Sequence, residues 1–163
     1  MKKYLILFFA ILTFTFVSCD TETSTDSGGT PVEKIAGDWW ITTQEYPGSP
    51  ALIHIYNTAA NDGIEVWFDD TFWSTKEKVP CDVKTLTFGS DDALQNTSLN
   101  KDESLYNITV TIKNGKILEG AAKTPSGVAA DSIYCEVEYS DDPGTIYHFG
   151  GFRRTGFDDD ELK

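Results

Sequence analysis

Two histidines, His54 and His148, are the side chains in this 163-residue chain that titrate nearest to neutral pH in their ordinary state. Each lies in an apolar stretch that predicts a β-strand. A Ser-His-Asp triad needs a serine against one of them, and the chain carries no G-x-S-x-G elbow. Neither His nor Cys recurs at the spacing of metal ligands. The sequence therefore predicts no catalytic residue, no metal site and no cofactor, and a hydrogen-bonded strand histidine is the simpler interpretation.

An apolar N-terminal segment ends at Cys19. Residues 4–17 follow Lys2 and Lys3 and have the length of a signal-peptide hydrophobic region, shorter than a membrane-spanning helix. The stretch FVSC resembles the lipobox of bacterial lipoproteins, in which the cysteine sulfur receives a diacylglyceryl group. An ordinary cleaved signal is the alternative, but its A-x-A-like site is absent. The sequence predicts a signal peptide at residues 1–18 and a lipid anchor at Cys19.

A polar segment follows the cysteine. Residues 20–31 contain no large apolar side chain, so they cannot bury enough surface to offset the entropy of ordering. We expect residues 19–31 to form a flexible tether. An acidic start rich in Ser and Thr resembles the export signals of Bacteroidetes surface lipoproteins, which favours the outer membrane or the cell surface. An aspartate directly after the cysteine favours the inner membrane in enterobacteria, so the leaflet stays open.

The remaining residues, 32–163, have the length of one domain. The formal net charge of the chain is −13, and loss of Lys2 and Lys3 with the signal peptide makes it more negative. A surface this acidic does not attract nucleic acid or anionic lipid. The composition therefore excludes nucleic-acid binding.

Cys81 and Cys135 are the two cysteines of the predicted domain. A disulfide between them is one interpretation, because nothing outside the cytoplasm keeps thiols reduced. Each cysteine shares a face with alternating apolar residues, which favours two separate small core groups. Both interpretations remain open.

Apolar and polar residues alternate from Trp39 onward, with turn residues between the alternating stretches. Asn114-Gly115 suits a type I′ hairpin turn, which would make residues 116–122 run back along residues 105–113. Further turns are predicted at residues 47–50, 61–63, 69–70 and 142–144. Strands are predicted at residues 38–46, 52–58, 64–68, 72–79, 84–88, 105–113, 116–122, 132–139 and 145–153.

Strands joined by successive hairpins form a meander, and a long meander removes its exposed edges by closing. The predicted fold is all-β, an antiparallel up-and-down meander that closes into a lipocalin-like barrel of about eight strands. Residues 89–104 are polar and unpatterned and predict a loop at one mouth of the barrel. Residues 158–161 are all acidic and predict a solvated tail.

Gly37-Asp38-Trp39 opens the first predicted strand, and Arg153-Arg154 ends the last one. This arrangement resembles the calycin pattern of lipocalins and fatty-acid-binding proteins, in which a Gly-x-Trp packs under an arginine and closes one barrel end. A guanidinium above an indole gains cation–π attraction while its N–H groups bond to carbonyls. We therefore expect Gly37, Trp39, Arg153 and Arg154 to close one end.

A wider resemblance covers residues 35–157. The Bacteroidetes lipoprotein family called lipid-binding putative hydrolases is similar to five segments of this chain, GDWWITTQE, HIYNTAANDGIEVWFDD, FWSTKEKVPCDV, DSIYCEVEYSDDPGT and RRTGF. The resemblance implies a lipocalin-like barrel, attachment to the outer membrane and an apolar ligand. The hydrolase part of the family's name corresponds to no catalytic motif here, so the residues favour a binding protein over an enzyme.

Aromatic side chains on predicted strands are the best candidates for ligand binding. A barrel of about eight strands can be filled by its side chains or can hold one small ligand, and aromatic rings serve either purpose. The candidate ligand-binding residues are Trp40, His54, Trp67, Trp73, Tyr106, Tyr134 and His148.

Three functions follow in order of preference. The first is an exported, lipid-anchored protein that binds a lipid or other small apolar molecule in its barrel. The second is a surface module with a filled barrel, either a glycan- or protein-binding accessory or an inhibitor. The third is a hydrolase with His54 or His148 in a cleft beside a hydroxyl and a carboxylate. The sequence identifies no protein partner.

Overall fold

Nine strands and one turn of 3₁₀ helix make up the secondary structure of residues 29–162, the part of the chain that the computed structural model describes. The strands are β1 (Gly37–Thr43), β2 (Ala51–Asn57), β3 (Glu65–Asp70), β4 (Thr75–Asp82), β5 (Thr87–Phe88), β6 (Leu94–Gln95), β7 (Thr109–Lys123), β8 (Ala129–Tyr139) and β9 (Tyr147–Arg153), and the helix is η1 (Asp158–Asp160).

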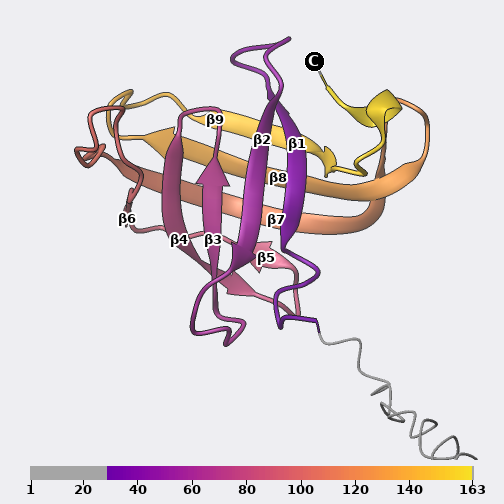
Figure 1. Cartoon of the computed structure of the whole chain (residues 1–163), viewed down its shortest axis with the longest axis horizontal. Helices are drawn as coiled ribbons and strands as arrows, with labels where there is room; N and C mark the ends of the chain where they lie inside the picture. The colour runs from indigo at the N-terminus through magenta and orange to yellow at the C-terminus, as the bar shows by residue number, and fades with distance from the viewer. Residues whose placement is uncertain (1–28, 163) are drawn as a thin grey trace, which may run out of the picture.

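The sheet closes on itself because β9 returns to β1 and β5 joins β7. Strands β1 to β5 pair in chain order, as do β7 to β9, and every pairing is antiparallel. In Figure 1, β1 to β4 stand upright while β7 to β9 cross behind them. The short β6 adds to β7 beyond β5. The predicted fold, an antiparallel up-and-down barrel, is confirmed.

The hairpin predicted at Asn114-Gly115 is wrong, because β7 runs through both residues without reversing. The register of β7 against β8 shifts between Lys113 and Lys116, and Asn114 has a φ of 54°, so the pair forms a bulge. An asparagine at positive φ suits a bulge as well as a hairpin turn. Gly115 permits close contact with β5, since an added Cβ would collide with the carbonyl oxygen of Phe88.

The turn predicted at Asp69-Asp70 is also wrong, because both residues end β3 and the chain reverses over residues 71–74. The side chain of Asp70 accepts hydrogen bonds from the backbone N–H groups of Phe72 at 2.7 Å and Trp73 at 3.3 Å. Aspartate favours turns through this kind of bond. Here the bond lets Asp70 begin the turn while its own backbone stays in the sheet.

The segment predicted as a loop, residues 89–104, contains β6 and a fully buried asparagine. The side chain of Asn96 accepts the N–H of Lys76 on β4 at 2.8 Å and donates to the carbonyl of Tyr106 at 2.7 Å. Asn96 therefore joins β4 to the chain leading into β7. A single buried polar residue adds no periodicity to the sequence, so the pattern could not reveal this contact.

Alternate side chains point into the barrel and form one contiguous core. The core residues that are at most 2 % exposed on the strands are Trp39, Ile41, Ile53, Ile55, Val66, Phe68, Val79, Val110, Ile112, Ile133, Cys135, Val137, Tyr139, Tyr147 and Phe149. Burial of this apolar surface is the main force that stabilises the fold.

One end of the barrel is closed by Trp39 and Arg153. The guanidinium carbon lies 4.3 Å from the centre of the indole ring, and its N–H groups donate to the backbone carbonyls of Ala36 and Lys34. Gly37 has a φ of 143°, and an added Cβ would collide with the guanidinium. Only glycine fits this position without strain.

The chain just before β1 seals the same end. Val32 and Ile35 are fully buried, and the Trp39 indole N–H donates to the carbonyl of Ile35 at 3.2 Å. Arg154 takes another direction from Arg153 and bonds the carboxylate of Glu161 at 2.8 Å. Of the two arginines, only Arg153 lies over the tryptophan.

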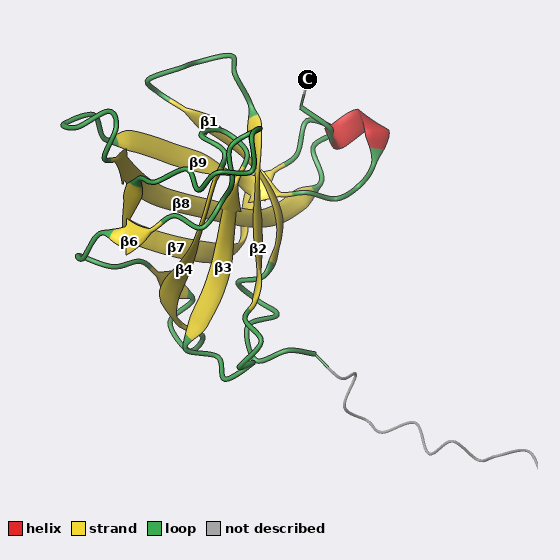
Figure 2. Ribbon diagram, turned by 60° about the vertical axis from the view of Figure 1, so that its left-hand side comes forward, coloured by secondary structure: helices red, strands yellow, loops and turns green. Residues whose placement is uncertain are grey.

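The acidic C-terminal segment is not fully solvated, contrary to the prediction. Asp160 of η1 is 1 % exposed and accepts hydrogen bonds from the backbone of Ser126 at 3.0 Å and the hydroxyl of Thr155 at 2.7 Å. These bonds hold the pKa of Asp160 well below its usual range. Figure 2 shows η1, in red, outside the barrel wall.

Candidate functional site

Aromatic rings gather at the barrel end opposite Trp39. This aromatic cap consists of Tyr46, Phe72, Trp73, Tyr139, Tyr147 and Phe149. Trp73 stacks on Tyr139 with ring centres 4.6 Å apart, and Phe72 meets Phe149 edge to face at 5.5 Å. Phe149 is fully buried whereas Tyr46 is 52 % exposed. The cap therefore extends from the core to the surface.

Two of the predicted ligand residues, Trp73 and Tyr106, meet at Asp141 in the β8–β9 connection. The Trp73 indole N–H donates to one carboxylate oxygen at 3.1 Å, and the Tyr106 hydroxyl donates to the other at 2.5 Å. Burial and this hydrogen bond both raise the pKa of Tyr106. The hydrogen bond to Asp141, in the connection between β8 and β9, thus holds the Trp73 ring over the barrel end.

Asp70 lies beneath the aromatic cap and is 1 % exposed. Besides the turn N–H groups, it accepts the hydroxyl of Tyr139 at 2.5 Å. Burial raises the pKa of Asp70 to about 6, while the hydrogen bonds from Tyr139, Phe72 and Trp73 oppose the rise. Asp70 therefore joins the strand, the turn and the cap.

Glu77 is a second buried carboxyl group near Asp70. On the β3–β4 ladder Thr75 lies opposite Asp70 and Glu77 lies opposite Phe68, so these side chains share the inner face. Both carboxyl oxygens of Glu77 and the hydroxyl of Thr75 are buried without a hydrogen-bond partner. Burial raises the pKa of Glu77 to about 8 and the negative charge of Asp70 adds to the rise, while the nearby Thr75 hydroxyl opposes it. We call Asp70 and Glu77 the acid pair.

Neither member of the acid pair is among the residues predicted to form a site. The sequence pattern predicts a turn at Asp70, because aspartate is common in turns. Glu77 carries a usable signal, since the period-two pattern that places Val79 and Cys81 inward also places Glu77 inward. A carboxylate at a predicted core position is rare enough to mark a site.

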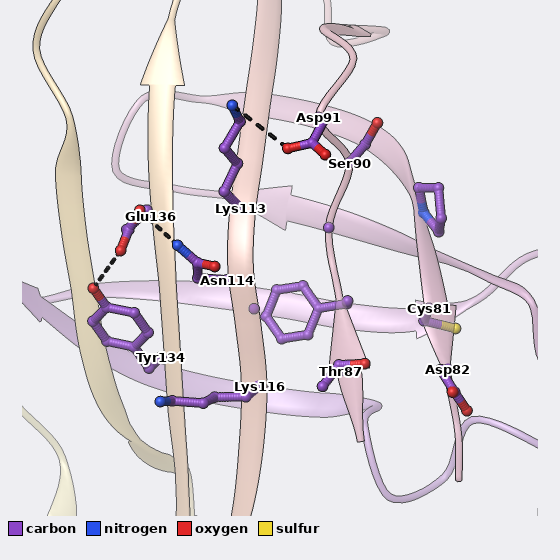
Figure 3. Close-up of a pocket in the computed structure, with 14 residues that line it drawn as sticks. Cys81, Asp82, Thr87, Ser90, Asp91, Lys113, Asn114, Lys116, Tyr134 and Glu136 are labelled. Carbon is purple, nitrogen blue, oxygen red and sulfur yellow. Dashed lines mark hydrogen bonds and ion pairs between the residues drawn. The ribbon is translucent and has the colours of Figure 1, made fainter. Parts of the chain in front are cut away.

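The outside of the barrel has a separate open hollow of about 900 Å³ over the seam between β5 and β7. Figure 3 shows Lys113, Asn114 and Lys116 of β7 beside Tyr134 and Glu136 of β8. The Tyr134 hydroxyl donates to Glu136 at 2.9 Å, and the Lys116 ammonium lies 5.3 Å from the Tyr134 ring centre. Charged groups of both signs and one half-buried aromatic ring suit a polar ligand.

A smaller hollow of about 520 Å³ is also lined by Tyr134, together with His148. The Nδ1 atom of His148 lies 2.8 Å from the carboxylate of Glu45, which also accepts the hydroxyl of Thr43. Burial raises the pKa of Glu45, but the hydrogen bonds from Thr43 and His148 outweigh it and bring the pKa to about 2. Tyr134 and His148 are thus neighbours on the outer surface.

The other predicted ligand residues lie apart on the outer face. His54 pairs with Asp38 at 2.7 Å, and the Trp40 indole donates to Glu161 at 3.2 Å. Trp67 lies under the ammonium groups of two β4 lysines. Within residues 29–162 no hydrogen bond joins either histidine to a serine, so the geometry assembles no triad.

Cys81 and Cys135 are free thiols, and Cys135 is fully buried. The structure therefore has no disulfide between them. Cys19 and the predicted signal peptide lie outside the described residues. Among the residues described, no three His, Cys, Asp or Glu side chains gather as a metal site would require. No helix in residues 29–162 is long and apolar enough to cross a membrane.

The closed antiparallel barrel with a Trp–Arg end is of the lipocalin-like class. Residues 24–158 match the family described as "lipid-binding putative hydrolase". The chain belongs to this lipid-binding family, which confirms the resemblance found in the sequence. No curated protein matches the chain.

Proposed function

We propose that this protein binds a lipid or a similar apolar molecule at the aromatic cap. Its membership in the lipid-binding family supports a lipid as the ligand. The position of the binding site is supported by the series of aromatic rings that extends from exposed Tyr46 to buried Phe149. Rings of this kind contribute large apolar contact areas. The opposite end is sealed by Arg153 and the chain before β1.

Entry of a ligand requires the β3–β4 turn to move, because Phe72 and Trp73 lie across the barrel end. Ser74 in this turn has a φ of 62°, which is strained for a residue other than glycine. Such strain is common at segments that clamp a ligand. In this proposal residues 71–74 form the gate.

The test is native mass spectrometry of the chain from residue 20, purified from lipid-producing cells. We expect one lipid per protein molecule. Trp73→Ala removes a cap ring and is expected to weaken lipid binding about tenfold, a loss of about 1.4 kcal/mol. Trp67→Ala, on the outer face, is the matched control and is expected to retain the lipid. A protein that carries no lipid, or equal losses in both variants, would contradict the proposal.

The finer proposal is that the protein is a lipoprotein anchored through Cys19 at the outer membrane or cell surface. The FVSC stretch and the polar segment behind it support this location. In a bacterium that processes lipoproteins, we expect the wild type to incorporate labelled fatty acid and to sediment with membranes. Cys19→Ser is expected to lose both properties. Label retained by Cys19→Ser would refute the anchor.

A surface interaction module is the second candidate function. The outer hollow favours it, because a ring face at Tyr134 surrounded by lysine, amide and carboxylate groups suits a sugar. A glycan array tests this function, with Tyr134→Ala as the variant and Trp40→Ala as the control. We do not propose hydrolysis, because neither histidine bonds a serine within residues 29–162.

A further inference from the structure

Three of the four unpartnered buried side-chain oxygens in residues 29–162 belong to Glu77 and Thr75, beneath the aromatic cap. Burying a polar group without a partner costs about 1–3 kcal/mol. Such atoms in a folded protein call for an explanation, and a bound group is one of the few available. The fourth, the Thr58 hydroxyl, lies just after β2.

The arrangement of the strands directs these atoms to one place. Thr75 and Glu77 are adjacent inward positions of β4, and Asp70 faces Thr75 from β3. Tyr139 lies next to them, because its hydroxyl bonds Asp70 and its ring stacks under Trp73. The unpartnered oxygens therefore lie directly inside the proposed gate.

The titratable groups around Glu77 are all acids. The titratable groups that act with it are Asp70 and Asp69 on β3 and Tyr139 and Cys135 on β8. None of the ion pairs within the described residues includes Asp70 or Glu77. The site therefore has buried acceptors and one buried carboxyl group, Asp70, that ionises above about pH 6, but no cation among the described residues.

We propose that the acid pair binds the primary ammonium group of an amine-bearing apolar ligand whose chain lies along the aromatic cap. An ammonium group offers three N–H donors, which match the three unpartnered oxygens of Glu77 and Thr75. Its positive charge would allow both carboxyl groups to ionise. This inference rests on the proposed function and adds the chemistry of the head group.

The test is isothermal titration calorimetry on the chain from residue 20, which contains every described strand. Decylamine, decanol and decanoate share one chain length and differ in the head group. At pH 7 we expect decylamine to bind at least about tenfold more tightly than the other two. Because Glu77 holds a proton in the free protein, decylamine is also expected to release protons, which titrations in buffers of different ionisation enthalpy will measure.

Glu77→Gln is expected to remove the preference for decylamine over decanol and the proton release. Thr75→Val removes one acceptor and is expected to reduce the preference without affecting proton release. Glu119→Gln changes an exposed carboxylate and serves as the matched control. Equal affinity for decylamine and decanol, or a preference that survives Glu77→Gln, would overturn this inference and leave lipid binding intact. Failure of all three ligands to bind, together with a lipid-free native mass spectrum, would overturn the proposed function as well.

Discussion

Glu77 links the stability of the barrel to pH. Its folded-state pKa of about 8 lies above the ordinary value of 4.5, so the folded protein holds this proton more tightly than the unfolded chain. The resulting contribution to the free energy of unfolding is complete below about pH 4.5 and is lost as the pH rises to about 8. Asp70 acts in the same direction up to about pH 6.

The substitution Glu77→Gln should remove much of this decline, because glutamine does not ionise. At pH 8 we expect the variant to be more stable than the wild type by roughly 2 kcal/mol, with little difference at pH 4.5. Urea denaturation at several pH values between 4.5 and 8 measures the effect. Glu119→Gln should follow the wild-type curve. A wild-type stability that stays constant over this range would show that Glu77 is not buried as a neutral acid.

Arg153 and Arg154 are adjacent in the chain but are expected to contribute differently to the free energy of unfolding. Arg153 bonds two backbone carbonyls and covers Trp39, whereas Arg154 bonds acidic side chains on the outer face. We expect Arg153→Gln to reduce the free energy of unfolding by about 2 kcal/mol, because carbonyl groups at the closed end lose their donors. Arg154→Gln should reduce it by much less, because ion pairs at the surface contribute little to stability. Similar losses in urea denaturation would contradict a special role for Arg153.

At the scale of elements, closure of the barrel depends on a contact between the shortest strand of the ring and the longest. Strand β5 has two residues, and it meets β7 at the bulge of Asn114 and Gly115. The bulge brings the two backbones close together, and Asn96 continues the seam beyond β5. The seam is thus formed by segments that make few regular β-sheet pairings.

Gly115→Ala tests the seam. The added Cβ would contact the carbonyl oxygen and ring of Phe88, so we expect a loss of stability of at least about 2 kcal/mol. Gly150→Ala on β9 is the matched control, because no atom lies within 4 Å of its added Cβ. Amide exchange in β5 should accelerate in Gly115→Ala, because the seam opens locally. Stability equal to that of the control would mean that β5 does not depend on this contact.

For the molecule as a whole, the two ends of the barrel differ in construction. The end near Trp39 is sealed by backbone bonds and by residues 32–36, whereas the end near Tyr46 is covered by a turn and aromatic rings. Residues 29–36, where the described chain begins, lie at the sealed end (Figure 1). The cap therefore lies at the end away from the point where the described chain begins.

Truncation tests the contribution of the sealing segment. A chain that begins at residue 37 loses Val32 and Ile35, which are 1 % and 0 % exposed. We expect a decrease of about 3–5 kcal/mol in the free energy of unfolding relative to a chain that begins at residue 29. The chain from residue 29 should match the chain from residue 20. Equal stability of all three in urea denaturation would show that the barrel does not need this segment.

Local patterns predicted the strands of this protein well because a strand with one buried face alternates at every second residue. The same patterns could not distinguish a turn from a bulge at Asn114-Gly115, since both place asparagine at positive φ. They also assigned Asp70 to a turn, although its side chain forms the turn while its backbone belongs to β3.

The sequence by itself determined the fold class, the pairing of Trp39 with an arginine from the last strand and the family, because these depend on periodicity and on residues at the two ends of the domain. Only the tertiary structure determined which of the candidate ligand-binding residues lie close together. Trp73 joined the aromatic cap while Trp40 and Trp67 remained on the outer face. The acid pair emerged because β3 and β4 pair in one register, and a shift of one residue would turn Glu77 toward solvent. Long-range register brings such residues together, and no local segment of the chain contains that information.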